Sequence, residues 1–158
     1  MSADQFAQRS AARLAAVQAL YQMEVSGATS ADIAADFQAG RLPRDEAGPV
    51  DSEPDPDLFR ALVENAVARQ TTIDRAIARR LATGWRLERI DSVARAILRA
   101  GAVELEQRRD IPTPVVIDEY VELAKSFFDG PEPGFINATL DACARDLRAE
   151  AEDVGGRI

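Results

Sequence analysis

Apolar residues recur along most of the chain at spacings of three and four, which is the period of a helix with one buried face. The first such segment carries Leu14, Val17, Leu20, Tyr21 and Val25. It stops at Gly27, a residue type that commonly ends a helix. No segment shows the strict apolar and polar alternation that is typical of a half-buried strand. The pattern therefore predicts an all-α protein.

Cap residues and breakers predict where the next helices begin. Ser30 is expected to cap a short helix. Asp55, followed by Pro56, is expected to cap a longer one that ends near Gly84. Thr71-Thr72 lies inside this longer segment and would divide it in two.

Three more helices are predicted in the second half of the chain. Asp91 is expected to cap a helix that runs to about Gln107, and Thr113-Pro114 forms the cap and first position of the next one. A final helix is predicted from about Phe135 to Ala149, with Cys143 on its apolar stripe. The segmentation gives six helices, or seven if the long one divides.

The length of 158 residues favours one compact domain, which we assign to residues 1–150. Residues 40–55 combine glycine, proline and acidic residues, and are interpreted as an acidic loop. Residues 151–158 are interpreted as a frayed tail. No apolar run is long enough to span a bilayer, and the start of the chain lacks the features of a secretion signal. A cytoplasmic protein with no membrane partner is expected.

Charge is distributed unevenly. The net charge of −8 argues against sequence-independent binding to a long polyanion, which normally needs a basic footprint. The acidic residues gather between positions 32 and 57, however, and arginines are dense between positions 69 and 109. This separation is compatible with local contact to nucleic acid.

The residues that most enzymes need are missing. The chain contains no histidine, and its glycines do not form a phosphate-binding loop. Adjacent acids such as Asp118 and Glu119 are interpreted as a solvated face. Cys143 is interpreted as a core thiol, with a reactive or metal-binding role as the alternative. We therefore expect a protein that is not an enzyme and has no cofactor and no metal site.

Several sequence blocks in a fixed order resemble the NusB family. They include Arg9-Ser10-Ala11-Ala12-Arg13, Gln18-Ala19-Leu20-Tyr21, Trp85-Arg86-Leu87-Glu88-Arg89-Ile90, Glu122-Leu123-Ala124-Lys125-Ser126-Phe127 and Phe135-Ile136-Asn137-Ala138-Thr139-Leu140. The resemblance covers about residues 9–148 and departs mainly at 40–55. It implies seven helices in two small orthogonal bundles.

The resemblance also implies a function in transcription antitermination. Proteins of this family act with the ribosomal protein NusE and bind boxA, a single-stranded RNA element of ribosomal RNA operon leaders. RNA polymerase, in a complex with other Nus factors, is thereby kept from terminating early. A short single strand needs only a few cationic contacts, so the net charge is compatible with this function.

The first helix is expected to contact RNA through four residues that match the family pattern. Arg9 and Arg13 lie four positions apart near the start of the helix, and we assign them phosphate contacts. Gln18 and Tyr21 are assigned to bases, through an amide and an aromatic ring. The alternatives are solvated arginines and a core position for Tyr21.

The second half supplies the remaining candidates. Lys125 is expected to bind phosphate, and Phe135 and Asn137 are expected to meet RNA at the start of the last helix. The alternatives are a solvated lysine and a phenylalanine that packs at the helix entry. Glu88 is the candidate for binding a basic protein partner, and Trp85 is interpreted as a packing anchor in preference to a base-stacking platform.

Two other functions compete with this interpretation. One is a helical adaptor that binds only protein, which the net charge favours. The other is a stand-alone relative of the RNA-engaging domain of a ribosomal RNA methyltransferase. The sequence leaves open whether the chain is a monomer or a homodimer.

Overall fold

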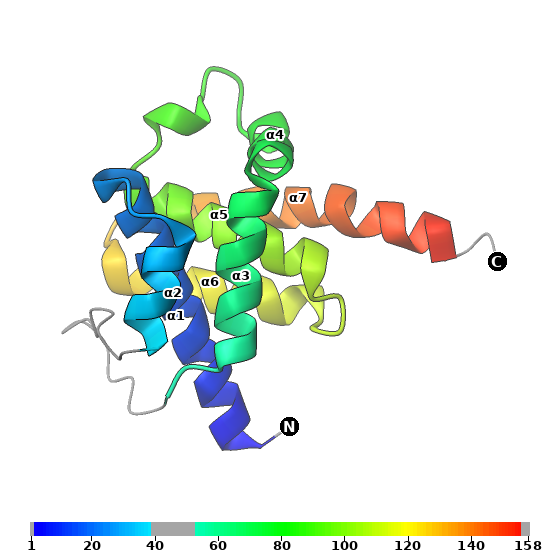
Figure 1. Cartoon of the computed structure of the whole chain (residues 1–158). Coiled ribbons are helices and arrows are strands. Elements are labelled where there is room, and N and C mark those ends of the chain that lie inside the picture. The colour runs from blue at the N-terminus through cyan, green and yellow to red at the C-terminus, as the bar shows by residue number, and fades with distance from the viewer. Residues whose placement is uncertain (1, 39–52, 156–158) are drawn as a thin grey trace.

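The computed structural model describes residues 2–38 and 53–155, and within these ranges all regular structure is helical. The elements are α1 (Ala3–Ser26), α2 (Ser30–Gln38), α3 (Pro56–Ala68), α4 (Gln70–Arg80), the 3-10 turn η1 (Leu87–Arg89), α5 (Ser92–Gln107), α6 (Thr113–Phe127) and α7 (Glu132–Gly155). The predicted all-α class with about seven helices is confirmed (Figure 1). None of the described helices is both long and apolar enough to cross a membrane.

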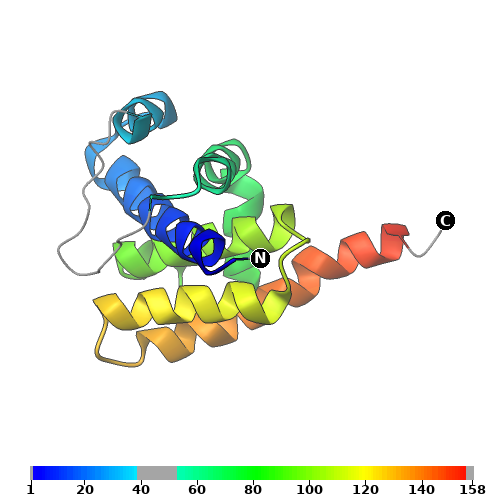
Figure 2. The same cartoon turned by 90° about the horizontal axis from the view of Figure 1, so that it is seen from below.

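Helix α5 is the centre of the fold. It packs against α1, α3, α4, α6 and α7, and its residues 94–98 and 100–105 are all buried. Helices α1, α2 and α3 pack on one another, and α6 and α7 lie side by side on α5 (Figure 2). In Figure 1, α3 runs across the direction of α7. These two groups of crossing helices, which share α5, are the arrangement that the family resemblance implied.

A glycine allows α7 to approach α5 closely. A Cβ atom on Gly101 would lie 2.9 Å from Cδ1 of Leu140 and 3.4 Å from Cδ2 of Tyr120. Leu140 and Tyr120 are fully buried, so the space above Gly101 is filled by the side chains of two other helices. The contact fixes the spacing of the three helices around which the second group is built.

The first two helix starts are set by reciprocal side-chain caps. Ser2 accepts a hydrogen bond from the backbone N–H of Gln5 at 3.2 Å, and Gln5 accepts one from the N–H of Ser2 at 3.0 Å. Thr29 and Asp32 do the same at the start of α2, with both distances 3.1 Å. The predicted cap Ser30 is therefore wrong by one position. Helix α1 ends as predicted, because Gly27 adopts a φ of 73° that favours glycine.

The predicted division of the long central segment is confirmed, but its position differs. Asp55 caps α3 and Pro56 occupies its first turn, as expected. The break lies at Arg69, with φ −114° and ψ 21°, and not at Thr71-Thr72. Helix α4 then ends before Leu81, which is extended, so Gly84 lies in the following loop.

The last two helices and the predicted loop and tail also differ in their limits. Helix α6 begins at Thr113, with Pro112 as its cap. Helix α7 begins at Glu132 and continues to Gly155, into the stretch predicted as a frayed tail. Residues 40–52 of the predicted acidic loop and residues 156–158 of the tail lie outside the described residues.

The buried face of α1 is not the one that the large apolar residues suggested. Leu14 is half-buried, and Tyr21 and Val25 are exposed. The core face is made instead by Val17, Leu20 and the alanines Ala11, Ala12, Ala15, Ala16 and Ala19. Small side chains let α1 lie close to α3 and α5, and alanine contributes little to a hydrophobic pattern read from sequence.

Candidate binding surfaces

A charged network lies inside the fold, between α1, α5 and α6. The Arg13 side chain is 2% exposed and donates two hydrogen bonds to Glu104, from Nε at 2.9 Å and from Nη2 at 2.7 Å. Tyr120 donates a third hydrogen bond to Glu104 at 2.8 Å. Glu119 lies 3.3 Å from Nη1 of Arg13 and accepts a hydrogen bond from Ser10 at 2.9 Å. Each buried charge thus has a partner of opposite sign.

This network corrects the role expected for Arg13. Burial disfavours the charged guanidinium, but the hydrogen bonds and charge of Glu104 outweigh it and raise the pKa of Arg13. Arg13 reaches the lining of the cavity at Arg9, but its side chain is only 2% exposed and its nitrogens face the carboxylates of Glu104 and Glu119. The sequence placed Arg13 beside Arg9 on one helical face, but position 13 belongs to the stripe of Val17 and Leu20, which is buried. Arg13 therefore stabilises the fold.

Arg9 lies where the sequence predicted, at the accessible end of α1. It is half-buried and lines a cavity of about 420 Å³ together with Phe6, Asp55, Asp110 and Pro112. A hydrogen bond from Arg108, supported by the charges of Arg108 and Arg9, lowers the pKa of Asp110. The cavity adjoins the connector between α5 and α6.

A basic cleft lies on the other side of the same connector. It has a volume of about 510 Å³ and is lined by Arg109, Thr113, Asp141, Ala144, Arg145, Arg148 and Ala149. Arg148 donates to the carbonyl oxygens of Leu105 at 2.8 Å, Arg108 at 3.0 Å and Ile111 at 2.8 Å. It therefore ties α7 to the end of α5 and to the connector.

Of the three arginines of the basic cleft, Arg145 pairs with Asp141 at 3.0 Å, whereas the hydrogen bonds of Arg109 and Arg148 go to neutral oxygens. The hydrogen bonds of Arg148 go to carbonyl oxygens and to the hydroxyl of Thr113, and those of Arg109 go to the carbonyl oxygens of Glu106 and Leu147. Burial lowers the pKa of Arg148 more than the charges of Glu104 and Asp110 raise it, and the charge of Arg109 adds to the lowering. An anion in the cleft would relieve this cost, so the cleft is suited to bind phosphate.

The sequence interpretation missed this cleft, although a signal was present. Asn137, Asp141, Arg145 and Arg148 follow one another at intervals of four, four and three, which places them on one side of α7. Arg109 is brought to the same place only by the turn after α5. The helical spacing could have been recognised, whereas the approach of the connector depends on tertiary packing.

The other residues expected to bind RNA are spread over the surface. Gln18 is half-buried, and Tyr21 and Asn137 are exposed. Lys125 is exposed and forms an ion pair with Glu122 at 2.9 Å, within one turn of α6. Phe135 is half-buried, and its ring lies 5.8 Å from that of Trp85. The structure does not gather these five residues with Arg9 in one pocket.

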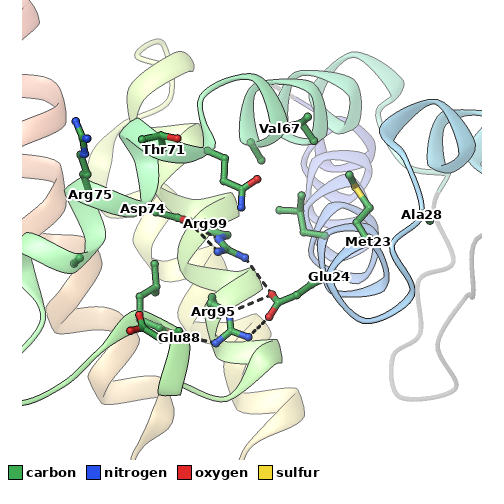
Figure 3. Close-up of a pocket in the computed structure, with 15 residues that line it drawn as sticks. Met23, Glu24, Ala28, Val67, Thr71, Asp74, Arg75, Glu88, Arg95 and Arg99 are labelled. Carbon is green, nitrogen blue, oxygen red and sulfur yellow. Dashed lines mark hydrogen bonds and ion pairs between the residues drawn. The ribbon is translucent and has the colours of Figure 1, made fainter.

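A larger groove lies between the end of α1, α3, α4, η1 and α5 (Figure 3). Its volume is about 790 Å³, and apolar side chains including Leu20, Met23 and Val67 form part of its lining. Glu88, the residue predicted to bind a protein partner, is exposed and also lines the groove. The apolar and charged lining is typical of a protein-binding surface.

Four charged side chains form a connected cluster in this groove. Glu24 binds both Arg95 and Arg99, and Arg99 also binds Asp74, with Nε of Arg99 2.8 Å from the carboxylate (Figure 3). The two acids are the more exposed members, at 30% for Glu24 and 26% for Asp74, against 9% for Arg95 and 17% for Arg99. The cluster therefore presents carboxylates outwards, with the arginines behind them.

Arg95 also fixes the turn that carries Glu88. Its Nη1 donates to the carbonyl oxygens of Leu87 at 3.0 Å and Ile90 at 2.7 Å. These bonds hold η1 against the start of α5. Glu88 thus joins Glu24 and Asp74 as a third carboxylate on the groove.

Comparison with known proteins identifies the relatives of this arrangement. A model of the NusB family matches residues 10–145. The chain belongs to the NusB family. Among its relatives is the transcription antitermination protein NusB of Caulobacter vibrioides, which is 57% identical over 94% of this chain and 99% of its own length. The NusB of Maricaulis maris is 49% identical over 90% of this chain and 89% of its own length.

Solved structures of NusB proteins have the same fold. NusB of T. maritima superposes with a TM-score of 0.71 at 30% sequence identity, covering 87% of this chain and 90% of that one. A crystal structure of the antitermination factors NusB and NusE in complex with dsRNA gives a TM-score of 0.70 at 24% identity. The match covers 88% of this chain and 97% of that one. The family predicted from the sequence blocks is thereby confirmed.

Proposed function

We propose that this chain is a transcription antitermination factor that binds a short single-stranded RNA together with a NusE-type ribosomal protein. The observation that carries the proposal is the basic cleft around Arg145 and Arg148. A second surface, the groove, presents Glu24, Asp74 and Glu88 together with three arginines and apolar side chains. The names of the relatives and the fold shared with a complex of NusB, NusE and dsRNA support the proposal.

The RNA surface starts at Arg9 and crosses the connector between α5 and α6 to the basic cleft. Arg9 lines the cavity on one side of this connector, and Arg109, Arg145 and Arg148 line the cleft on the other. Phosphate groups bind arginine by charge-assisted hydrogen bonds, and a few such contacts are enough to hold a short single strand. The expected RNA is of boxA type, from the leader of a ribosomal RNA operon.

The groove is the proposed binding site of the NusE-type partner. Its outward carboxylates favour a partner that presents lysine or arginine side chains. The apolar side chains of Met23 and Val67 would lose contact with water when the partner binds, which stabilises the complex. A basic partner on this groove would also add positive charge to an acidic protein. RNA binding is therefore expected to strengthen when the partner is present.

The test is binding of a fluorescently labelled boxA-type RNA oligonucleotide, measured by anisotropy at low salt with and without NusE of the same organism. We expect binding that tightens with NusE. The double variant Arg9→Gln/Arg145→Gln should bind several-fold more weakly and have a shallower salt dependence, by about 0.7 in the log–log slope for each phosphate that is no longer neutralised.

The control is Arg60→Gln, compared with each single variant Arg9→Gln and Arg145→Gln, because it also removes one charge. Arg60 is an exposed arginine of α3 that pairs with Glu64 and lines neither the cavity at Arg9 nor the basic cleft. The RNA affinity of Arg60→Gln should equal that of the unaltered protein. Absence of RNA binding at low salt in both conditions would overturn the proposal. Binding of NusE alone would then favour a purely protein-binding adaptor.

A further inference from the structure

Trp85 is a largely exposed aromatic residue in the loop between α4 and η1. The residue is 57% exposed, which does not fit the packing anchor that the sequence favoured. Its ring contacts the ring of Phe135 at the start of α7, with centroids 5.8 Å apart and planes inclined by 36°. Phe135 in turn packs against the hydrophobic core. The indole is thus supported from one side and open to solvent on the rest of its surface.

Two exposed arginines, Arg86 and Arg89, follow Trp85 within four positions of the chain. Neither forms an ion pair within the part of the chain that the structure describes. Most other arginines of the neighbouring elements differ, because Arg69, Arg80, Arg95 and Arg99 all bind carboxylates. Glu88, between the two, lines the groove next to α1, α3 and α4. An exposed ring followed at once by two exposed arginines is complementary to an anion that carries aromatic groups.

Helix α7 extends from this aromatic pair to the basic cleft. Phe135 lies at the start of the helix, and the stripe of Asn137, Asp141, Arg145 and Arg148 runs along it. From position 137 to position 148 this stripe spans about 16 Å at the helical rise of 1.5 Å per residue. A single strand seated in the cleft can therefore follow α7 towards Trp85 over a small number of nucleotides.

We propose that Trp85 is a stacking platform for an unpaired base of single-stranded RNA, with Arg86 and Arg89 binding the phosphates on either side. This inference rests on the proposed RNA-binding function and extends its surface to the opposite end of α7. Bases of any sequence have a flat aromatic face, and stacking on tryptophan or tyrosine is a common way to hold a strand without reading its sequence. Trp85 therefore adds affinity, and does not select the sequence.

Because the chain contains a single tryptophan, its intrinsic fluorescence reports on residue 85 alone. The complete protein is titrated with an unlabelled boxA-type RNA, and binding of the labelled RNA is followed in parallel by anisotropy. We expect quenching of tryptophan emission over the same concentration range as the anisotropy change. Trp85→Ala should weaken binding by about 5- to 50-fold, and Trp85→Phe should retain most of the affinity.

Two further variants separate stacking from charge and from loss of structure. Arg86→Gln/Arg89→Gln should reduce the salt dependence of binding, because two phosphates would no longer be neutralised. Val25→Ala removes an apolar side chain that is 58% exposed on α1, and should change neither emission nor affinity. Far-ultraviolet circular dichroism of each variant checks that the helices are retained.

The outcomes distinguish this inference from the function on which it rests. RNA binding by anisotropy, with unchanged emission and an unchanged affinity of Trp85→Ala, overturns the stacking platform and leaves the RNA-binding function in place. Absence of any anisotropy change overturns both. A Trp85→Ala variant that loses affinity for NusE while its affinity for RNA is unchanged assigns this surface to the protein partner and also overturns the platform.

Discussion

At the scale of single residues, the most consequential contact is the buried pair of Arg13 and Glu104. Two opposite charges are removed from water here, and their attraction is supported by the hydroxyl of Tyr120 and by Glu119. Burial, followed by the charge of Glu104, raises the pKa of Tyr120 well above its usual value, so its hydroxyl stays protonated and donates. Arg13, Glu104 and Tyr120 come from α1, α5 and α6, so their contacts fix the positions of these three helices relative to one another.

Replacement of Glu104 by alanine should destabilise the protein strongly. Arg13 would keep its charge in a site that is 2% exposed, and loss of one partner of a buried ion pair costs about 3 to 5 kcal/mol. Urea unfolding followed by circular dichroism should show this decrease in the free energy of unfolding. The apolar double variant Arg13→Met/Glu104→Leu should lose less, because the two most deeply buried charges are removed together and Glu119, at 14% exposed, keeps its hydrogen bond from Ser10.

The exposed pair of Arg145 and Asp141 provides the comparison for this measurement. Its side chains are 74% and 56% exposed, and Asp141→Ala should change the free energy of unfolding by no more than about 0.5 kcal/mol. If Glu104→Ala is equally mild, the assignment of Arg13 as a structural residue is wrong, and its role in RNA binding has to be reconsidered.

At the scale of helices, starting points depend on local chemistry and end points depend on neighbours. The caps Asp55 and Asp91 were predictable because a side-chain oxygen one position before a helix binds the free N–H groups of its first turn. The break at Arg69 was misplaced by two positions because both threonines that follow it fit within a helix. There the contacts of α3 with α1 and of α4 with α7 decide the geometry, and single-residue preferences do not encode them.

The cap of the central helix provides a test at this scale. Oδ1 of Asp91 accepts hydrogen bonds from the N–H groups of Val93 at 2.8 Å and Ala94 at 3.2 Å. Asp91→Ala should lower the free energy of unfolding by about 1 kcal/mol, measured by urea denaturation. Asp91→Asn keeps an oxygen acceptor and should be close to neutral. Equal losses in both variants would show that charge at position 91, and not the cap, stabilises α5.

At the scale of the whole molecule, the positions of the charged side chains decide the binding surfaces more than the net charge of −8 does. The sequence indicated an arginine-rich middle. It could not show that Arg95 and Arg99 bind Glu24 and Asp74, while Arg109 and Arg148 form no ion pair with any carboxylate among residues 2–38 and 53–155. That difference depends on which helices meet, since Glu24 and Arg95 are far apart along the chain. The family and its helices were therefore predictable, whereas the separation into a basic cleft and a groove of paired charges required the packed structure.

Ion pairs between carboxylates and arginines also predict how the stability of the protein depends on pH. Arginine partners lower the pKa values of Glu24, Glu106, Asp110 and Asp146. Because these values are lower in the folded state than in the unfolded chain, the unfolded chain takes up more protons as the pH falls. The stabilisation is complete above the ordinary carboxylate range, about pH 4.5, and is lost as the pH falls through the lowered values.

Between about pH 5.5 and 8 the stability should be nearly constant, because the chain has no histidine and burial raises the pKa of Cys143 to about 11. Urea midpoints measured at steps of about half a pH unit should form a plateau over this range and then decrease below about pH 4.5. The quadruple replacement of the four carboxylates by their amides should reduce the decrease, since the amides cannot take up protons. A transition within the plateau would mean that another group titrates on unfolding, and would contradict the assignment of acid sensitivity to these ion pairs.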